Sequence, residues 1–207
     1  MKKVAIVDYG LANIRSVQNA LSCFQVDVSV ARTGGELIGS DAIVLPGVGS
    51  YDAGMKGVRS HGHEDALNEM VVRGNTPFLG ICLGLQFLFE SSSEGTQPGL
   101  GWLPGKLELF PSGNGAPKVP HMGWSDVEIL KPDGLFRGLN PPHTFYFVHS
   151  YHLPMNSEAE SFASAVCDYG KSFVAAVETN NIYAAQFHPE KSQLTGMKMI
   201  SNFLENI

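Results

Sequence analysis

The sequence Gly80-Ile81-Cys82-Leu83-Gly84 sets a cysteine between two glycines, at the point where one chain pattern gives way to another. Residues 77–81 form a short apolar run of the length of a buried parallel strand, and residues 84–90 have the character of a helix. A strand that turns directly into a helix leaves little room for Cβ atoms, which explains the glycines. We therefore expect a nucleophile elbow that presents Cys82 at the carboxyl edge of a parallel sheet. The helix N-terminus there favours thiolate over thiol.

The rest of the first half alternates between strand and helix patterns. Apolar or alternating runs predict strands at 4–7, 26–30 and 41–45. Helical spacing follows an N-cap at Asn13 as far as residue 24, and a second helix is predicted over 64–73, closed by Gly74. Regular alternation of this kind predicts a parallel sheet with helices on both faces.

The second half is richer in strands. We expect β-structure at 101–110, 124–130, 145–149, 162–167, 173–177 and 182–187, and a final helix at 194–204. We interpret residues 1–207 as one α/β domain. Its mostly parallel central sheet, covered by helices on both faces, gains antiparallel strands late in the chain.

Composition restricts the partners and the location. A net charge of −6 without a basic cluster argues against nucleic acid or an anionic membrane as the main partner. The apolar runs are strand-sized, and no secretory signal pattern begins the sequence. The three cysteines lack the spacing of a disulfide framework, which fits a reducing cytoplasm. We interpret Cys23 and Cys167 as small core residues. No cofactor is predicted. No metal site is predicted either, because His61 and His63 lack a third ligand at usable spacing and are interpreted as surface residues.

A thiolate that attacks an acyl carbon needs a base, and the base needs an orienting group. His188 closes the predicted strand 182–187, and Pro189 holds it in extended backbone. Glu190, two residues on, can fix the imidazole tautomer. Alone, this His-Pro-Glu sequence is more typical of a surface turn. Together with the elbow, it predicts a triad of Cys82, His188 and Glu190.

The negative charge that develops on the attacked carbonyl needs preorganised N–H donors. The amide of Leu83, directly after the nucleophile, is one candidate. The loop Pro46-Gly47-Val48-Gly49 follows a buried strand, so the amides of Val48 and Gly49 are the others. A plain strand-ending turn is the alternative interpretation of this loop.

Taken together, these motifs resemble the class I (triad) glutamine amidotransferases, whose domain is flavodoxin-like. Four further stretches look specifically like the glutaminase subunits that serve imidazole glycerol phosphate synthesis in histidine biosynthesis. They are residues 8–13, 45–49, 120–124 and 146–151, and residues 186–192 complete the pattern. The resemblance runs in order along the whole chain. It departs at Leu11-Ala12, where a small residue is usual, and at His61-Gly62-His63.

The resemblance implies that Cys82 forms a thioester during hydrolysis of glutamine. The ammonia would pass to a (β/α)8-barrel cyclase subunit, bound as a heterodimer, which makes imidazole glycerol phosphate and an aminoimidazole carboxamide ribotide. The loop 46–49 would form the oxyanion hole, and the orientation of the peptide group at Val48 would determine whether the hole is formed. Residues implied to hold glutamine are Gln86, His149, Ser150 and Tyr151, and those implied to face the barrel are Pro120, His121, Met122, Trp124 and Lys191.

Physical reasoning supports some of these assignments more than others. Gln86 lies one helical turn after Cys82, among apolar neighbours, so its amide can reach the site. The stretch 121–124 is either an exposed interface anchor or a buried hairpin corner. Three other functions stay open: a paralogous amidotransferase that serves sugar amination in surface-polysaccharide synthesis, a catalytically silent binding subunit, and a thiol peptidase.

Overall fold

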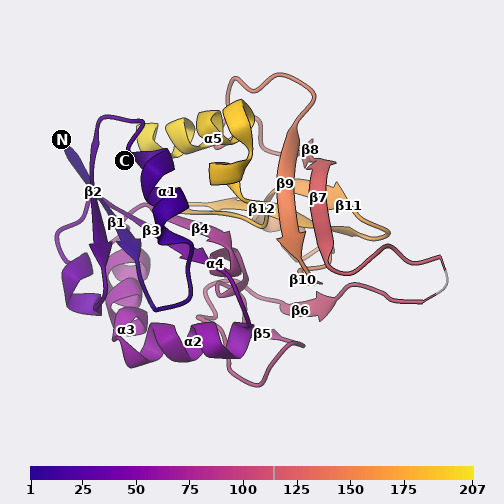
Figure 1. Cartoon of the computed structure of the whole chain (residues 1–207), viewed down its shortest axis with the longest axis horizontal. Coiled ribbons are helices and arrows are strands. Elements are labelled where there is room, and N and C mark those ends of the chain that lie inside the picture. Colours follow the sequence, from indigo (N-terminus) through magenta and orange to yellow (C-terminus); the bar gives the residue numbers. More distant parts are fainter. Residues whose placement is uncertain (114) are drawn as a thin grey trace.

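An eight-stranded sheet forms the centre of the molecule in the computed structural model, which describes residues 1–113 and 115–207 (Figure 1). Its strands stand in the order β2, β1, β3, β4, β13, β12, β11, β8. In that order their bounds are Val26–Ala31, Lys2–Val7, Ala42–Gly47, Phe78–Cys82, Ile182–Ala185, Ser172–Thr179, Ala163–Asp168 and Glu128–Ile129. The first five strands run parallel, and β12, β11 and β8 are each antiparallel to the neighbour before them.

Helices cover both faces of this sheet, and alternate residues of each buried strand supply the two cores. Val4 and Ile6 of β1 belong to the core under α1 and α5, whereas Ala5 and Val7 belong to the core under α2 and α3. The helix bounds are α1 Ile14–Leu21, α2 Tyr51–Ser60, α3 His63–Leu67, α4 Leu83–Gln86 and α5 Gln193–Glu205, with a π-helical turn at Asn68–Arg73. Short 3-10 turns lie at Gly34–Leu37, Ala159–Ser161 and Pro189–Lys191.

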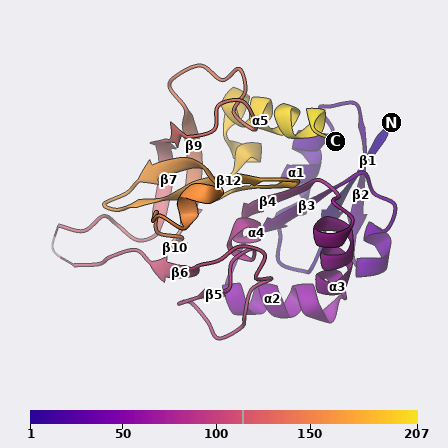
Figure 2. The ribbon, with the colours of Figure 1, turned by 180° about the vertical axis from the view of Figure 1, so that it is seen from behind.

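Two small sheets complete the fold beside the antiparallel end of the large one (Figures 1 and 2). β7 (His121–Asp126) pairs antiparallel with β9 (Thr144–His149). The second sheet has the order β10 (Tyr151–His152), β6 (Lys106–Leu109), β5 (Ser91–Ser92). The turn from β9 into β10 therefore joins the two small sheets at residues 149–151.

The predicted α/β fold with a mostly parallel sheet and late antiparallel strands is confirmed. Asn13 caps α1, since its side chain accepts from the Ser16 amide, and Gly74 closes the π turn. The sequence did not reveal α2, which contains two glycines that lower helix propensity. Both are needed for close packing, because a Cβ at Gly54 would lie 2.4 Å from the Phe87 ring and one at Gly57 2.6 Å from the Tyr9 carbonyl oxygen.

Other boundaries were wrong. The helix after Cys82 ends at Gln86 instead of residue 90, and the strand predicted over 101–110 is limited to β6. Cys23 was expected in the core but is exposed in the turn after α1, whereas Cys167 is buried as expected. In the described ranges, no helix combines the length and apolar character that crossing a membrane requires. The organisation of residues 1–207 as one domain stays a prediction.

Candidate active site

Cys82 ends β4 and directly precedes α4, as expected for an elbow. Its backbone has φ 55° and ψ −106°, a left-handed region that side chains rarely adopt. A residue held in such a conformation costs about 1–3 kcal/mol, which the surrounding structure must offset. The flanking glycines make the turn possible. A Cβ at Gly84 would lie 1.8 Å from the Leu45 carbonyl oxygen, and one at Gly80 2.8 Å from the Gly84 carbonyl oxygen.

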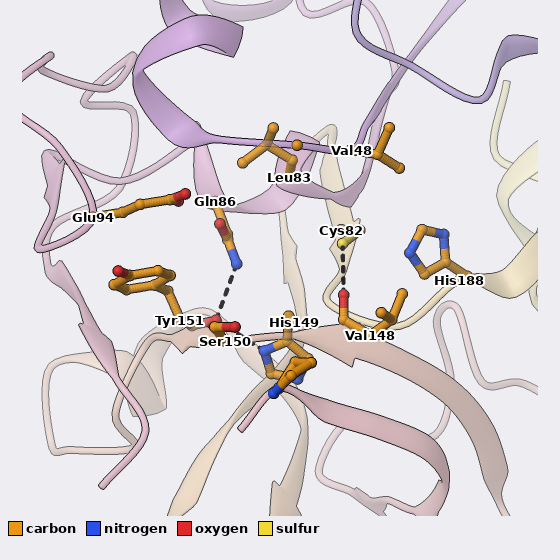
Figure 3. A pocket seen from close by; sticks show the side chains of 12 residues that line it. Val48, Cys82, Leu83, Gln86, Glu94, Val148, His149, Ser150, Tyr151 and His188 are labelled. Carbon is orange, nitrogen blue, oxygen red and sulfur yellow. Dashed lines mark hydrogen bonds between the residues drawn. The ribbon is translucent and has the colours of Figure 1, made fainter. Parts of the chain in front are cut away.

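His188 reaches Cys82 because β13 is the parallel neighbour of β4, with Ala185 opposite Ile81. Its Nδ1–H donates to Glu190 Oε1 at 2.8 Å, and both side chains are buried. This bond fixes the tautomer and leaves Nε2, which has no partner among the described residues, on the Cys82 side of the ring (Figure 3). Burial alone would lower the pKa of His188, but the neighbouring Cys82 and Glu190 outweigh it and raise the pKa above the ordinary value.

The sulfur of Cys82 has two further polar neighbours. It donates toward the Val148 carbonyl oxygen at 3.9 Å (Figure 3). It also accepts from Gln186 Nε2 at 3.7 Å. The thiol proton is thus directed at a backbone oxygen of β9. For the proton to reach His188, the S–H bond must turn away from that oxygen.

The two segments predicted to form the oxyanion hole differ in whether their backbone amides are already hydrogen-bonded elsewhere. Leu83 is the first residue of α4, where backbone amides lack a partner within the helix. The Val48 amide instead donates to the Leu11 carbonyl oxygen at 3.1 Å, away from the site. Gly49 follows with φ +94°, a conformation that glycine adopts without strain. Val48 can serve as an oxyanion donor only after its peptide turns, so its role stays a prediction.

A pocket of about 360 Å³ opens over Cys82 (Figure 3). It brings together all the residues predicted for catalysis, the oxyanion and glutamine except Glu190, which stands behind His188. Its lining consists of Val48, Gly49, Cys82, Leu83, Gln86, Glu94, Pro120, Val148, His149, Ser150, Tyr151 and His188. Chain segments far apart in sequence therefore form one chamber that can hold a small amino acid.

Gln86 is fixed in orientation by its own hydrogen bonds. Its Nε2 donates to the Tyr151 carbonyl oxygen at 3.0 Å and to Gln186 Oε1 at 3.1 Å. With both N–H groups engaged, the Oε1 atom is left as an acceptor. A bound α-ammonium group offers N–H donors of the kind this atom needs.

Glu94 is a functional candidate that sequence reasoning missed. It lies in a loop after β5 and lines the pocket, while its Oε2 accepts from the Tyr51 amide at 3.1 Å. Burial raises the pKa of its carboxyl group. The only signal in the sequence was an acidic residue in the run Ser91-Ser92-Ser93-Glu94-Gly95, which is also typical of an ordinary loop.

The residues predicted to face a partner divide into two groups. Met122 and Trp124, 62% and 48% exposed, stand on the outer face of β7, and Pro120 and Lys191 are exposed as well. His121 was expected with them but is 1% exposed. The strand alternation turns its ring inward, where it stacks on Tyr169 at 3.9 Å and on Phe147 at 4.7 Å between ring centroids.

His63 requires a similar correction. It was expected at the surface but is fully buried, and its Nε2–H donates to the Asp8 carbonyl oxygen at 3.2 Å. Burial lowers its pKa, so it serves as a neutral core donor. His61 is exposed as expected. In the part of the chain that the structure describes, no group of three or more His, Cys, Asp or Glu residues could hold a metal ion.

Comparison with known proteins defines the family. The sequence profile of the glutamine amidotransferase class-I family matches residues 5–207, and the chain belongs to this family. It is similar in fold to PurLQS from Thermotoga maritima (TM-score 0.75, 20% identity, 99% of this chain and 98% of that chain). It is similarly close to a solved glutamine amidotransferase (TM-score 0.71, 22% identity, covering 98% and 97%).

Among curated proteins, the chain is similar to imidazole glycerol phosphate synthase subunits HisH. The HisH of Bdellovibrio bacteriovorus is 44% identical over 204 residues, which cover 98% of this chain and 99% of that protein. The HisH of Moorella thermoacetica is 41% identical over 206 residues, which cover 99% and 95%. The family resemblance inferred from the sequence motifs is therefore confirmed.

Proposed function

We propose that this chain is the glutamine-hydrolysing subunit of an imidazole glycerol phosphate synthase and that Cys82, His188 and Glu190 are its triad. The observation that carries the proposal is the geometry at the β4 and β13 edge. A cysteine on a strained elbow, a histidine oriented by a buried carboxylate and a pocket of amino-acid size meet there. The full-length similarity to HisH subunits supports the same assignment.

The chemistry follows from these positions. His188 Nε2 takes the thiol proton, and the Cys82 sulfur attacks the side-chain amide carbon of glutamine, forming a C–S bond. As the C–N bond breaks, the protonated imidazole returns the proton to the nitrogen, and ammonia leaves. Water, activated by the same imidazole, then attacks the thioester and releases glutamate and the thiol. Glu190 stabilises the imidazolium in both steps.

Substrate placement follows from the pocket. The free Oε1 of Gln86 and the carboxylate of Glu94 are the acceptors for the α-ammonium group of glutamine. The turn at His149-Ser150-Tyr151 lines the opposite wall. This arrangement leaves the side-chain amide directed at Cys82.

The partner proposed is a (β/α)8-barrel cyclase subunit in a heterodimer, docked on the exposed Met122 and Trp124 of β7, with Pro120 and Lys191 beside them. Docking would turn the Val48 peptide into the site and complete the oxyanion hole. Removal of one oxyanion donor costs about 10²–10³-fold in rate. The free chain should therefore hydrolyse glutamine slowly. A cytoplasmic location belongs to the same proposal.

Replacement of Cys82 by alanine in the complex with the cyclase subunit tests the proposal. Glutamine-dependent synthesis should disappear, while synthesis from added ammonium salts continues. Loss of both activities would mean that Cys82 supports the fold instead of the chemistry.

Complementation separates the proposal from the sugar-amination paralogue, which the similarity to HisH subunits does not favour. The chain should restore growth of a histidine auxotroph that lacks this subunit. Failure to restore growth, with the protein present, would point to the paralogue. A glutamine-analogue electrophile should also label Cys82 in the complex, and absence of labelling would point to a catalytically silent binding subunit.

A further inference from the structure

Two buried histidines connect β7 to the wall of the glutamine pocket. His149 ends β9 and lines the pocket, and its Nδ1 lies 2.8 Å from the Tyr151 carbonyl oxygen. His121 Nδ1 lies 3.2 Å from His149 Nε2, and His121 Nε2 lies 2.9 Å from Ser125 Oγ. The triad chemistry uses neither imidazole, so the pair needs another explanation.

The directions of these hydrogen bonds can be deduced. A carbonyl oxygen only accepts, so His149 Nδ1 carries the proton. Burial lowers the pKa of His149 to about 3 and that of His121 to about 4, so both rings are neutral. His149 Nε2 is then an acceptor and His121 Nδ1 its donor. His121 Nε2 accepts from the Ser125 hydroxyl, and a single chain of donors runs from Ser125 to Tyr151.

The rings that carry this chain cannot turn freely. The rings of Tyr169 and Phe147 both stack on the His121 ring, each with an interplanar angle of 20°. His149 packs against Phe110 and Phe173, each 5.2 Å away between ring centroids. With exposed fractions of 1% for His121 and 6% for His149, the two imidazoles have little contact with water.

The chain ends where glutamine is recognised. The Tyr151 carbonyl oxygen accepts from His149 and also from Gln86 Nε2, which is 3.0 Å away. If His149 adopted the other tautomer, its donor to Tyr151 would be lost, and the carbonyl that orients Gln86 could move. The Tyr151 carbonyl oxygen at Nδ1 and the proton of His121 Nδ1 at Nε2 together hold His149 in the required tautomer.

We propose that His121 is a positioning residue for glutamine, which acts by donating from Nδ1 to His149 and so fixes the Tyr151 carbonyl and Gln86. The inference rests on the proposed function, because it assigns the pocket to glutamine. The hydrogen bond between His121 and His149 also links the wall of the pocket to β7, whose outer face carries Met122 and Trp124. A residue expected at the partner surface thus supports the substrate site from within.

Two amide substitutions separate the nitrogen atoms of His121. The side chain of His121→Asn places an N–H donor near the position of Nδ1, whereas His121→Gln places its amide near that of Nε2. Glutamine kinetics are measured on each variant in complex with the cyclase subunit. His121→Gln should raise KM for glutamine about 5- to 30-fold, the effect expected from loss of one or two hydrogen bonds. His121→Asn should keep KM within about threefold of the wild type.

Matched controls distinguish positioning from general stability. Tyr169→Phe removes a hydroxyl that donates to the Lys118 carbonyl oxygen at 2.9 Å, in the ring that stacks on His121, and should leave KM unchanged. Synthesis from ammonium salts should be equal in all variants. Equal KM values for the Asn and Gln variants would overturn the proposal, as would an unchanged KM in His121→Gln.

A spectroscopic measurement does not depend on the variants. Nitrogen-15 NMR of the histidine rings should find His121 and His149 both as Nδ1–H tautomers. An Nε2–H tautomer at His149 would overturn the proposal even if the variants fail to fold. The outcomes of the two proposals can be told apart. A wild-type complex that does not hydrolyse glutamine would refute the proposed function, whereas the NMR measurement tests the hydrogen bonds between His121, His149 and Tyr151 whether or not the complex is active.

Discussion

Gly84→Ala tests whether the nucleophile elbow depends on the close contact between α4 and β3. An added Cβ would lie 1.8 Å from the Leu45 carbonyl oxygen, and ordinary contact begins near 3.4 Å. Both groups are backbone-bound, so neither can rotate away. The helix must therefore retreat from β3 by about 1.6 Å, or the turn must deform.

The displacement would reach the reacting groups directly, because Leu83 and Cys82 are the two preceding residues. Catalytic groups must be held within about 0.5 Å of the productive geometry. A misplacement of 1 Å can cost about 10²-fold in rate. We expect Gly84→Ala to lower the glutamine-dependent rate at least about 10²-fold and to reduce the free energy of unfolding by about 1–3 kcal/mol.

The assay compares glutamine-dependent and ammonium-dependent synthesis in the complex, together with thermal unfolding. Gly80→Ala is a milder form of the same change, since its Cβ would lie 2.8 Å from the Gly84 carbonyl oxygen, and it should have an intermediate effect. Gly35→Ala, with no heavy atom within 4 Å of the added Cβ, is the matched control and should be neutral. Full glutamine-dependent activity in Gly84→Ala would refute the argument that this contact sets the elbow.

Three further predictions concern single side chains. Because Cys82 and Glu190 raise the pKa of His188 above 6.5 in spite of burial, protonated His188 should stabilise the fold fully below pH 6.5, and this contribution should be lost as the pH rises through the folded value. Between pH 6.5 and the raised pKa of His188, thermal unfolding of Glu190→Gln should therefore depend less on pH than that of the wild type. An equal dependence in the two proteins would contradict the role of Glu190 as the partner of His188. Glu94→Gln should raise KM for glutamine without changing ammonium-dependent synthesis, and steady-state kinetics that show an unchanged KM would remove it from the substrate site. Tyr9→Phe deletes a buried hydroxyl that has no hydrogen-bond partner in the described part of the chain, so chemical denaturation should find the free energy of unfolding unchanged or higher by about 1 kcal/mol, not lower.

The residues that the sequence revealed best are those whose chemistry depends on chain direction and order. The run before Cys82 has the length and apolar character of a buried parallel strand, and a strand before His188 that runs parallel to it ends at the same edge of the sheet. Their adjacency in register follows from the parallel pairing of β4 and β13. Local patterns therefore sufficed to predict the central sheet and the proximity of Cys82, His188 and Glu190, whose catalytic roles stay a prediction.

The sequence was less informative where a role depends on packing. Histidine counts as polar in any hydropathy pattern, yet His121 and His63 are buried because each finds a hydrogen-bond partner inside. Glu94 has no local signal, since the fold alone brings its loop over the pocket. The orientation of the Val48 peptide depends on a carbonyl in another loop, and side-chain patterns carry no record of it.

The hydrogen bond from Val48 to the Leu11 carbonyl has a consequence for how activity is regulated. A typical hydrogen bond contributes about 1 kcal/mol to the resting state, whereas an oxyanion donor contributes about 3–4 kcal/mol to the transition state. Under the oxyanion role proposed for Val48, the rate is therefore an amplified response to the direction of one peptide group. Changes near Leu11 that weaken this bond would raise the leak of ammonia from the idle subunit while leaving its maximum rate intact. Basal leak and full output can thus vary independently in this fold.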